Sequence, residues 1–168
     1  LIDILNNYIN GKTCSTVKLQ DVDWEYIISE ANAHNCLPLI THALSERSNE
    51  LPFGVWEKMQ YDSAYLGALQ YQKNHELKEV LKIFNDNEIE SCIFKGYAIA
   101  RLYPERLLRM SGDMDILISP DKMDLANRLL LERGYVVDEA SSKENVPVYI
   151  YKNTFVIELH SSLWEDYK

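Results

Sequence analysis

The chain has 168 residues, of which 46% are hydrophobic and 26% charged, a composition typical of folded globular proteins and not of disordered ones. Its formal net charge of −9 argues against a nucleic-acid polymer as partner, because binding to that backbone requires clustered lysine and arginine. No apolar run approaches the roughly 18 residues of a membrane span, so we expect no membrane partner.

Cysteine usage and the two ends of the chain bear on its origin. Cys14, Cys36 and Cys92 are odd in number and widely separated, with no CxxC spacing, so we expect a reducing, cytoplasmic environment. The N-terminus lacks the basic-then-apolar order of a signal peptide. Because the chain begins without methionine and ends directly after a motif-rich segment, we expect a fragment truncated at its C-terminus.

Helical periodicity dominates the first half of the chain. Trp24, Ile27, Ile28 and Ala31, for example, recur at i, i+3, i+4 and i+7. Such runs predict helices at residues 1–10, from residue 21 onward, at 39–45 and at 53–85. Residues 1–86 are therefore predicted to form an all-helical domain, and nothing in this half indicates catalysis.

Beyond residue 87, short apolar runs alternate with helical stretches, which indicates an α+β domain. Strands are predicted at residues 89–94, 113–118, 135–137, 146–151 and 154–159, and helices at 96–102 and 120–133. Ser119 is predicted to cap the second of these helices, and Gly134 to end it. We expect residues 87–168 to form a small mixed or antiparallel sheet with flanking helices.

Two aspartates, Asp113 and Asp115, stand at i and i+2 where the second strand begins. Side chains alternate along a strand, so both carboxylates point to one face while Met114, Ile116 and Ile118 point into a core. Two like charges on one face disfavour each other unless a cation lies between them, and hard oxygen ligands suit Mg²⁺ or Mn²⁺. On its own, the same pattern is also typical of a solvated strand start.

Glu158 strengthens the metal interpretation, because it interrupts the last apolar strand. A buried carboxylate is costly unless it is paired or bound to a cation. If this strand paired antiparallel with the strand at residues 113–118, three carboxylates would converge in an arrangement that holds two metal ions for displacement at phosphorus. A salt bridge to an arginine such as Arg109 is the alternative.

A second candidate element is Lys95-Gly96, which stands at a strand-to-helix junction. Backbone N–H groups at a helix start, a glycine that permits close approach and a lysine together form a phosphate-binding corner. Such a corner is also a common structural turn. Arg109, four residues before Asp113, is a candidate to neutralise a phosphate or to orient the carboxylates.

These motifs together resemble the uncharacterised nucleotidyltransferase family of the DNA polymerase beta superfamily. The resemblance rests on Phe94-Lys95-Gly96, Leu102-Tyr103-Pro104, the segment from Arg109 to Ile118, and Ile157-Glu158-Leu159-His160, and it covers roughly residues 88–164. It implies the nucleotidyltransferase fold, with Asp113 and Asp115 as the first two metal ligands and Glu158 as the third. It also implies that Lys95-Gly96 is the phosphate corner.

One departure concerns that corner, because most of the superfamily has Gly-Ser where this chain has Lys-Gly. The hydroxyl expected at the triphosphate is therefore missing, and Lys95 could substitute as a cation. His160 belongs to the family's Glu-x-His pattern, and its expected roles are to orient Glu158, to contact substrate, or to pack.

Three functions follow as hypotheses. The first is an enzyme that transfers a nucleoside monophosphate from an NTP to a hydroxyl or amine of a small molecule or protein, with Mg²⁺ or Mn²⁺, releasing pyrophosphate. The second is a nucleotide-binding or partner-binding module that keeps the fold without turnover, suggested by the missing hydroxyl. The third, ranked last, is a glycosyltransferase with an Asp-x-Asp metal site, a fold that needs a larger parallel sheet before the motif.

Overall fold

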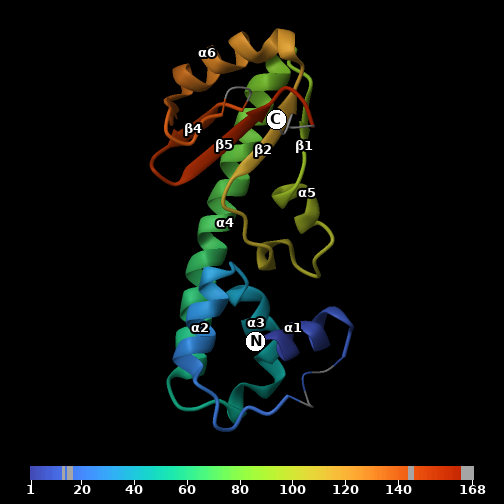
Figure 1. Ribbon diagram of the computed structural model, residues 1–168, viewed down its shortest axis with the longest axis vertical. Coiled ribbons are helices and arrows are strands. Elements are labelled where there is room, and N and C mark those ends of the chain that lie inside the picture. The colour runs from blue at the N-terminus through green and yellow to red at the C-terminus, as the bar shows by residue number, and fades with distance from the viewer. Residues whose placement is uncertain (13, 15–16, 144–145, 164–168) are drawn as a thin grey trace. The chain divides into compact units, whose positions relative to one another are not determined.

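The computed structural model describes residues 1–168 apart from 13, 15, 16, 144, 145 and 164–168 (Figure 1). The chain divides into two packing units. One, the helical unit, comprises Leu1–Tyr71 and Leu102–Met110, and the other, the sheet unit, comprises Gln72–Arg101 and Ser111–Lys168. The division falls within one long helix, and the domain boundary expected after residue 86 stays a prediction.

The helical unit contains every helix predicted for the first half of the chain. It consists of α1 (Ile2–Ile9), α2 (Trp24–Ala33), α3 (Leu37–Leu44), the first part of α4 (Val55–Asp86), and the 3-10 turns η2 (Ser45–Glu50) and η3 (Arg106–Leu108). The Asp23 carboxylate accepts a hydrogen bond from the Tyr26 N–H at 3.0 Å and so caps α2. None of the helices in the described part of the chain is both long and apolar enough to cross a membrane.

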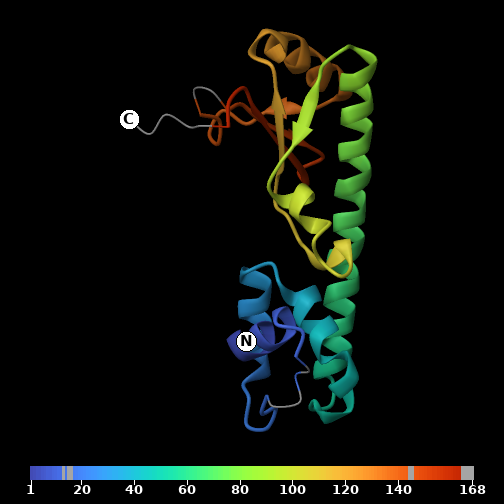
Figure 2. The same cartoon turned by 90° about the vertical axis from the view of Figure 1, so that its right-hand side faces the viewer.

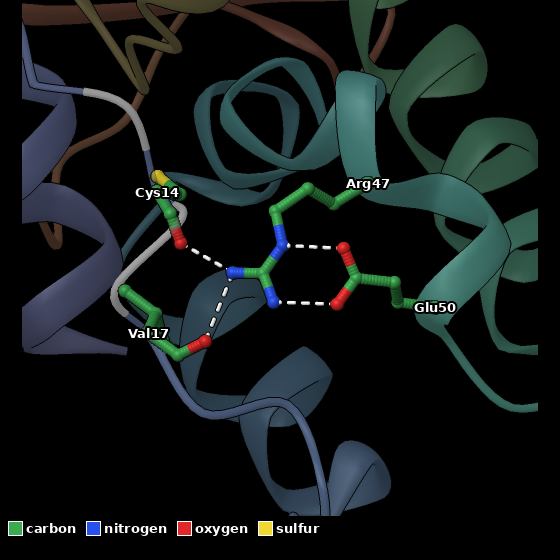
Figure 3. Close-up of polar contacts among 4 residues, drawn as sticks. All are labelled: Cys14, Val17, Arg47 and Glu50. Carbon is green, nitrogen blue, oxygen red and sulfur yellow. Dashed lines mark hydrogen bonds and ion pairs between the residues drawn. The ribbon is translucent and has the colours of Figure 1, made fainter.

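Arg47 of η2 contacts the backbone at Cys14 and Val17, between α1 and α2 (Figure 3). Its Nε and Nη2 donate to the two carboxylate oxygens of Glu50 at 2.8 and 2.6 Å. Its Nη1 donates to the carbonyl oxygens of Cys14 and Val17, the latter at 2.9 Å. The planar guanidinium thus satisfies a carboxylate and two backbone acceptors at once. The cluster thereby connects the backbone at Cys14 and Val17 to η2.

The sheet unit is built on a five-stranded mixed sheet, which confirms the α+β fold. Its strands are β1 (Ser91–Ile93), β2 (Met114–Ile118), β3 (Val136–Val137), β4 (Val148–Tyr151) and β5 (Phe155–His160), in the order β1-β2-β5-β4-β3. The helical elements are α5 (Gly96–Ala100), η4 (Pro120–Lys122), α6 (Met123–Arg133) and the end of α4. Gly134 ends α6 as predicted, in a left-handed conformation with φ of 102°.

The sheet has an apolar and a polar face in the region of β2 and β5. Apolar side chains of both strands pack with Leu77 and Phe84 of α4 and Leu130 of α6 in one buried core. Figure 2 shows this part of α4 running along the sheet. Because side chains alternate, the even positions of β2 and the odd positions of β5 enter this core, and Asp115, Glu158 and His160 lie on the opposite face.

Two expectations for this unit were wrong. β5 lies beside β2 as proposed, but the two strands run parallel, because the chain returns through α6 and the β3–β4 pair before it enters β5. Ser119 does not cap the following helix through its side chain, since its hydroxyl donates to the Asp121 carboxylate instead. Neither change moves the carboxylates to the apolar face.

Candidate metal and phosphate site

The centre of the candidate site is Asp115, the second residue of β2. The neighbouring core residues Met114 and Ile116 fix the strand, and the alternation turns Asp115 to the polar face. Its side chain is only 2% exposed. A carboxylate this deeply buried requires a cation or several hydrogen-bond donors.

Glu158 is the register partner of Asp115 in the parallel pair of β2 and β5. Two adjacent strands therefore place their carboxylates side by side on one face. The Glu158 side chain is 27% exposed, which leaves this carboxylate accessible from solvent. The convergence predicted from the sequence is thus present for these two acids, although it depends on parallel pairing.

His160, two residues after Glu158, completes the group. Its Nε2 lies 3.3 Å from Asp115 Oδ1 and 3.5 Å from Glu158 Oε2, and its side chain is 4% exposed. The Phe94 ring meets the imidazole edge-on, with ring centroids 4.9 Å apart. Asp115, Glu158 and His160 each offer one ligand atom, and these atoms lie within 4.8 Å of one another. His160 therefore lies close to both carboxylates, and the roles expected for it stay predictions.

Lys95 supplies the positive charge of the cluster. Its Nζ donates to Asp115 Oδ1 at 2.6 Å, while 55% of its side chain remains exposed. This hydrogen bond raises the pKa of Lys95, and the charges of Asp115, Glu158 and Asp113 raise it further. The lysine of the predicted phosphate corner therefore lies against the predicted metal ligands.

The backbone of Lys95 is unusual, with φ of 55° and ψ of −128°, a region that residues with a side chain rarely adopt. This conformation ends the extended segment after β1 and lets α5 begin at the next residue. A glycine would adopt it without strain. The lysine at this position therefore places an ammonium group beside Asp115 at the cost of an unfavourable backbone conformation.

Gly96 is required by packing. A Cβ at this position would lie 2.8 Å from Ser111 Cβ, closer than real side-chain contacts, so the loop before β2 is packed directly on the start of α5. At the glycine that was predicted to allow close approach of a phosphate, the structure places the loop that contains Ser111. This contact places Ser111 beside the Lys95-Gly96 corner.

Asp113 lies just before β2, and Lys73 of α4 fixes its loop. The Lys73 Nζ donates to the carbonyl oxygens of Ser111 and Gly112 at 3.0 and 3.1 Å. Burial lowers the pKa of Lys73, and the charge of Asp113 partly offsets this effect. Among the described residues, Asp113 is not one of the three whose ligand atoms converge. Its role as a metal ligand stays a prediction.

Arg109 belongs to the segment of the chain that packs with the helical unit. Its Nη1 donates to the carbonyl oxygen of Met110. Its predicted role at a phosphate remains a prediction. Sequence reasoning missed Lys73, because one lysine on a long polar helix carries no signal of the loop that it contacts.

Comparison with known proteins gives one finding. A family model described as an uncharacterised nucleotidyltransferase matches residues 20–168. The match includes the whole candidate site and most of the helical unit. No curated protein and no solved structure gives a significant match to the chain.

Proposed function

Because the chain belongs to the uncharacterised nucleotidyltransferase family, we propose that it transfers a nucleoside monophosphate from an NTP to an acceptor hydroxyl or amine. The observation that carries this proposal is the pairing of Asp115 and Glu158 in register on the polar face of β2 and β5, with His160 Nε2 close to both. The acceptor is a small molecule or a protein.

The donor set fits a divalent cation such as Mg²⁺ or Mn²⁺. Asp115 and Glu158 would hold it, and Asp113 would join them once the loop before β2 adjusts. When bound, such a cation neutralises the developing charge on the triphosphate and orients it. The buried Asp115 supports this fit, because one exposed lysine is its only hydrogen-bonding cation among the described residues.

The reaction forms a bond between the acceptor oxygen or nitrogen and the α-phosphorus. The bond from that phosphorus to the oxygen bridging the β-phosphate breaks, and pyrophosphate leaves with the electron pair. Glu158, the more exposed of the two paired carboxylates, takes the proton of the acceptor. The acceptor thus gains the nucleoside monophosphate and loses a proton, and pyrophosphate is the second product.

In this proposal, Lys95 and the backbone at Gly96 bind the triphosphate. The Lys95 ammonium lies 2.6 Å from Asp115 Oδ1 and is more than half exposed, so it can turn from the carboxylate to a phosphate. A cation held by Asp115 would favour this exchange, because it would repel the Lys95 ammonium.

The test is mass spectrometry of products after incubation with each NTP, Mg²⁺ or Mn²⁺ and a cell extract, with pyrophosphate measured in parallel. We expect a nucleotide-modified product and pyrophosphate with the wild type and with the control Asp124→Asn, whose side chain is exposed on α6. Asp115→Asn is expected to abolish both. Equal turnover by Asp115→Asn would contradict the proposal.

A second candidate is a nucleotide-binding module without turnover. The Lys95 ammonium already occupies Asp115 Oδ1, and the corner lacks the hydroxyl of Gly-Ser, which together favour binding without chemistry. Calorimetric binding of NTP with Mg²⁺, without pyrophosphate release for any acceptor in the extract, would select this candidate.

A further inference from the structure

The imidazole of His160 is the least satisfied polar group in the described part of the sheet unit. Its side chain is 96% buried, and its Nε2 is the only buried side-chain nitrogen or oxygen of the described residues without a hydrogen-bond partner. A buried polar atom without a partner costs about 1–3 kcal/mol. The fold nevertheless places this nitrogen close to two carboxylates, an arrangement that stability alone does not explain.

We infer that His160 Nε2 is a direct ligand of the cation, so that the site offers one nitrogen and two carboxylates. The inference depends on the proposed function only for what the bound cation does, and not for whether His160 coordinates it. It narrows the choice of ion to a first-row transition metal, Mn²⁺ or Zn²⁺ and not Mg²⁺, because such metals accept an imidazole ligand and Mg²⁺ prefers oxygen ligands.

The distances between the donor atoms support a shared ion. Ligands about 2.0–2.2 Å from a metal lie roughly 3.0–3.4 Å apart when they are neighbours in its coordination shell. His160 Nε2 is 3.3 Å from Asp115 Oδ1 and 3.5 Å from Glu158 Oε2. The imidazole nitrogen is therefore spaced from each carboxylate as for a shared ion, and all three ligand atoms lie within 4.8 Å of one another.

The supports of the imidazole also favour ligation. The backbone of His160 is held in β5, paired with Leu117 of β2, and the Phe94 ring packs edge-on against the imidazole with planes inclined at 76°. Such packing restricts the ring to an orientation with Nε2 toward the carboxylates. Metal-bound histidines are oriented by contacts outside the coordination shell, most often a hydrogen bond from the second ring nitrogen, and here the Phe94 ring provides a packing contact.

In the absence of an ion, Lys95 is the cation that pairs with Asp115. Its ammonium contacts Asp115 at 2.6 Å, but among the described residues no hydrogen bond satisfies His160 Nε2. The lysine therefore replaces part of the charge of a divalent cation and does not replace its bond to nitrogen. An imidazolium paired with both carboxylates is the competing arrangement, and the following experiment separates the two.

The test is electron spin echo spectroscopy of Mn²⁺ bound to the protein without nucleotide, combined with calorimetric titration of Mn²⁺ and Mg²⁺. We expect a ¹⁴N modulation typical of a coordinated imidazole, which changes when histidine is labelled with ¹⁵N. In His160→Gln the modulation disappears and the affinity for Mn²⁺ falls at least about tenfold, with a smaller loss for Mg²⁺. His75→Gln, an exposed histidine of the same unit, is the control and leaves both unchanged.

Absence of the modulation in wild-type protein saturated with Mn²⁺ would overturn the inference, as would unchanged Mn²⁺ affinity in His160→Gln or failure of the wild type to bind Mn²⁺. If His160→Gln does not fold, the ¹⁵N-labelled wild type decides alone. None of these readouts requires turnover, so a protein that coordinates Mn²⁺ through nitrogen but transfers no nucleotide would contradict only the proposed function.

Discussion

Two buried carboxylates of the sheet unit, Glu76 and Asp115, are satisfied in opposite ways. Glu76 of α4 is 6% exposed and accepts three hydrogen bonds, two from Arg133 at 3.1 and 2.9 Å and one from the Tyr135 hydroxyl at 3.2 Å. Asp115 is 2% exposed, and among the described residues its carboxylate accepts one hydrogen bond, from the half-exposed Lys95. Only the first carboxylate has a complete and rigid set of partners.

The difference distinguishes a structural charge from a functional one. The Glu76 cluster joins the end of α6 to α4 through a bidentate guanidinium, and burial beside Glu76 raises the pKa of Tyr135. In the Asp115 cluster, a second carboxylate and the His160 Nε2, which has no hydrogen-bond partner among the described residues, face the Asp115 carboxylate. A fold that had only to be stable would gain from donors there, so the Asp115 cluster is the candidate for ligand binding.

The largest expected effect comes from substituting Glu158, the more exposed carboxylate of the Asp115 cluster. Glu158→Gln removes a proposed metal ligand and proton acceptor, so we expect pyrophosphate release to slow by about 1,000-fold, equivalent to about 4 kcal/mol of barrier. The free energy of unfolding is expected to stay within about 0.5 kcal/mol. A variant that keeps its turnover, with folding verified by circular dichroism, would remove Glu158 from the site.

Glu76→Gln is the matched change in the complete cluster. It leaves Arg133 facing a neutral amide, and because Arg133 is partly exposed we expect a loss of about 2 kcal/mol in the free energy of unfolding rather than the full cost of an isolated buried charge. Urea denaturation measures this loss. Turnover per folded molecule is expected to be unchanged, and a fall as large as that of Glu158→Gln would erase the distinction between the clusters.

Gly96→Ala tests how the loop that carries Asp113 is positioned. The added Cβ would meet Ser111 Cβ at 2.8 Å, so we expect a loss of about 2 kcal/mol in the free energy of unfolding as the loop is displaced. Gly112→Ala is the control in the same loop, because open space surrounds that position. Equal destabilisation by the two substitutions would mean that the contact with Ser111 is unimportant.

Substitutions of Lys95 are expected to have the smallest effect on the free energy of unfolding. They separate the contribution of the backbone conformation from that of the side chain. Both Lys95→Gly and Lys95→Ala lose the ion pair with Asp115, but only glycine adopts φ of 55° and ψ of −128° freely. We expect the glycine variant to exceed the alanine variant by about 1 kcal/mol in the free energy of unfolding. Greater stability of the alanine variant would show that no strain is stored at this position.

Much of this arrangement was readable from the sequence. The helices and strands followed from apolar periodicity, and the alternation at Asp115 and Glu158 assigned both acids to one face of the sheet. The convergence of those acids was also expected. Its geometry was not, because parallel pairing of β2 and β5 is decided by the path of the chain through α6, which no residue of either strand encodes.

Most contacts of the polar side chains with distant segments could not be predicted. The phosphate role of Lys95 stays a prediction, but its hydrogen bond to Asp115 was not foreseen, and neither was the packing of Gly96 against a loop fifteen residues away. Lys73 and Glu76 lie on a helix that was predicted correctly, yet their partners, Ser111 and Arg133 among them, are set by tertiary packing. Periodicity reports which face is buried and says nothing of what the polar atoms meet.

The most direct measurement of the central claim is metal-dependent unfolding of the wild type and of Asp115→Asn. At a Mn²⁺ concentration of about 100 times Kd, the wild type is expected to gain about 2.7 kcal/mol in the free energy of unfolding, reversed by a chelator. Asp115→Asn is expected to gain nothing, and the control Asp124→Asn to behave as the wild type. An equal gain in Asp115→Asn, or no gain in the wild type, would contradict the claim that this cluster holds a cation.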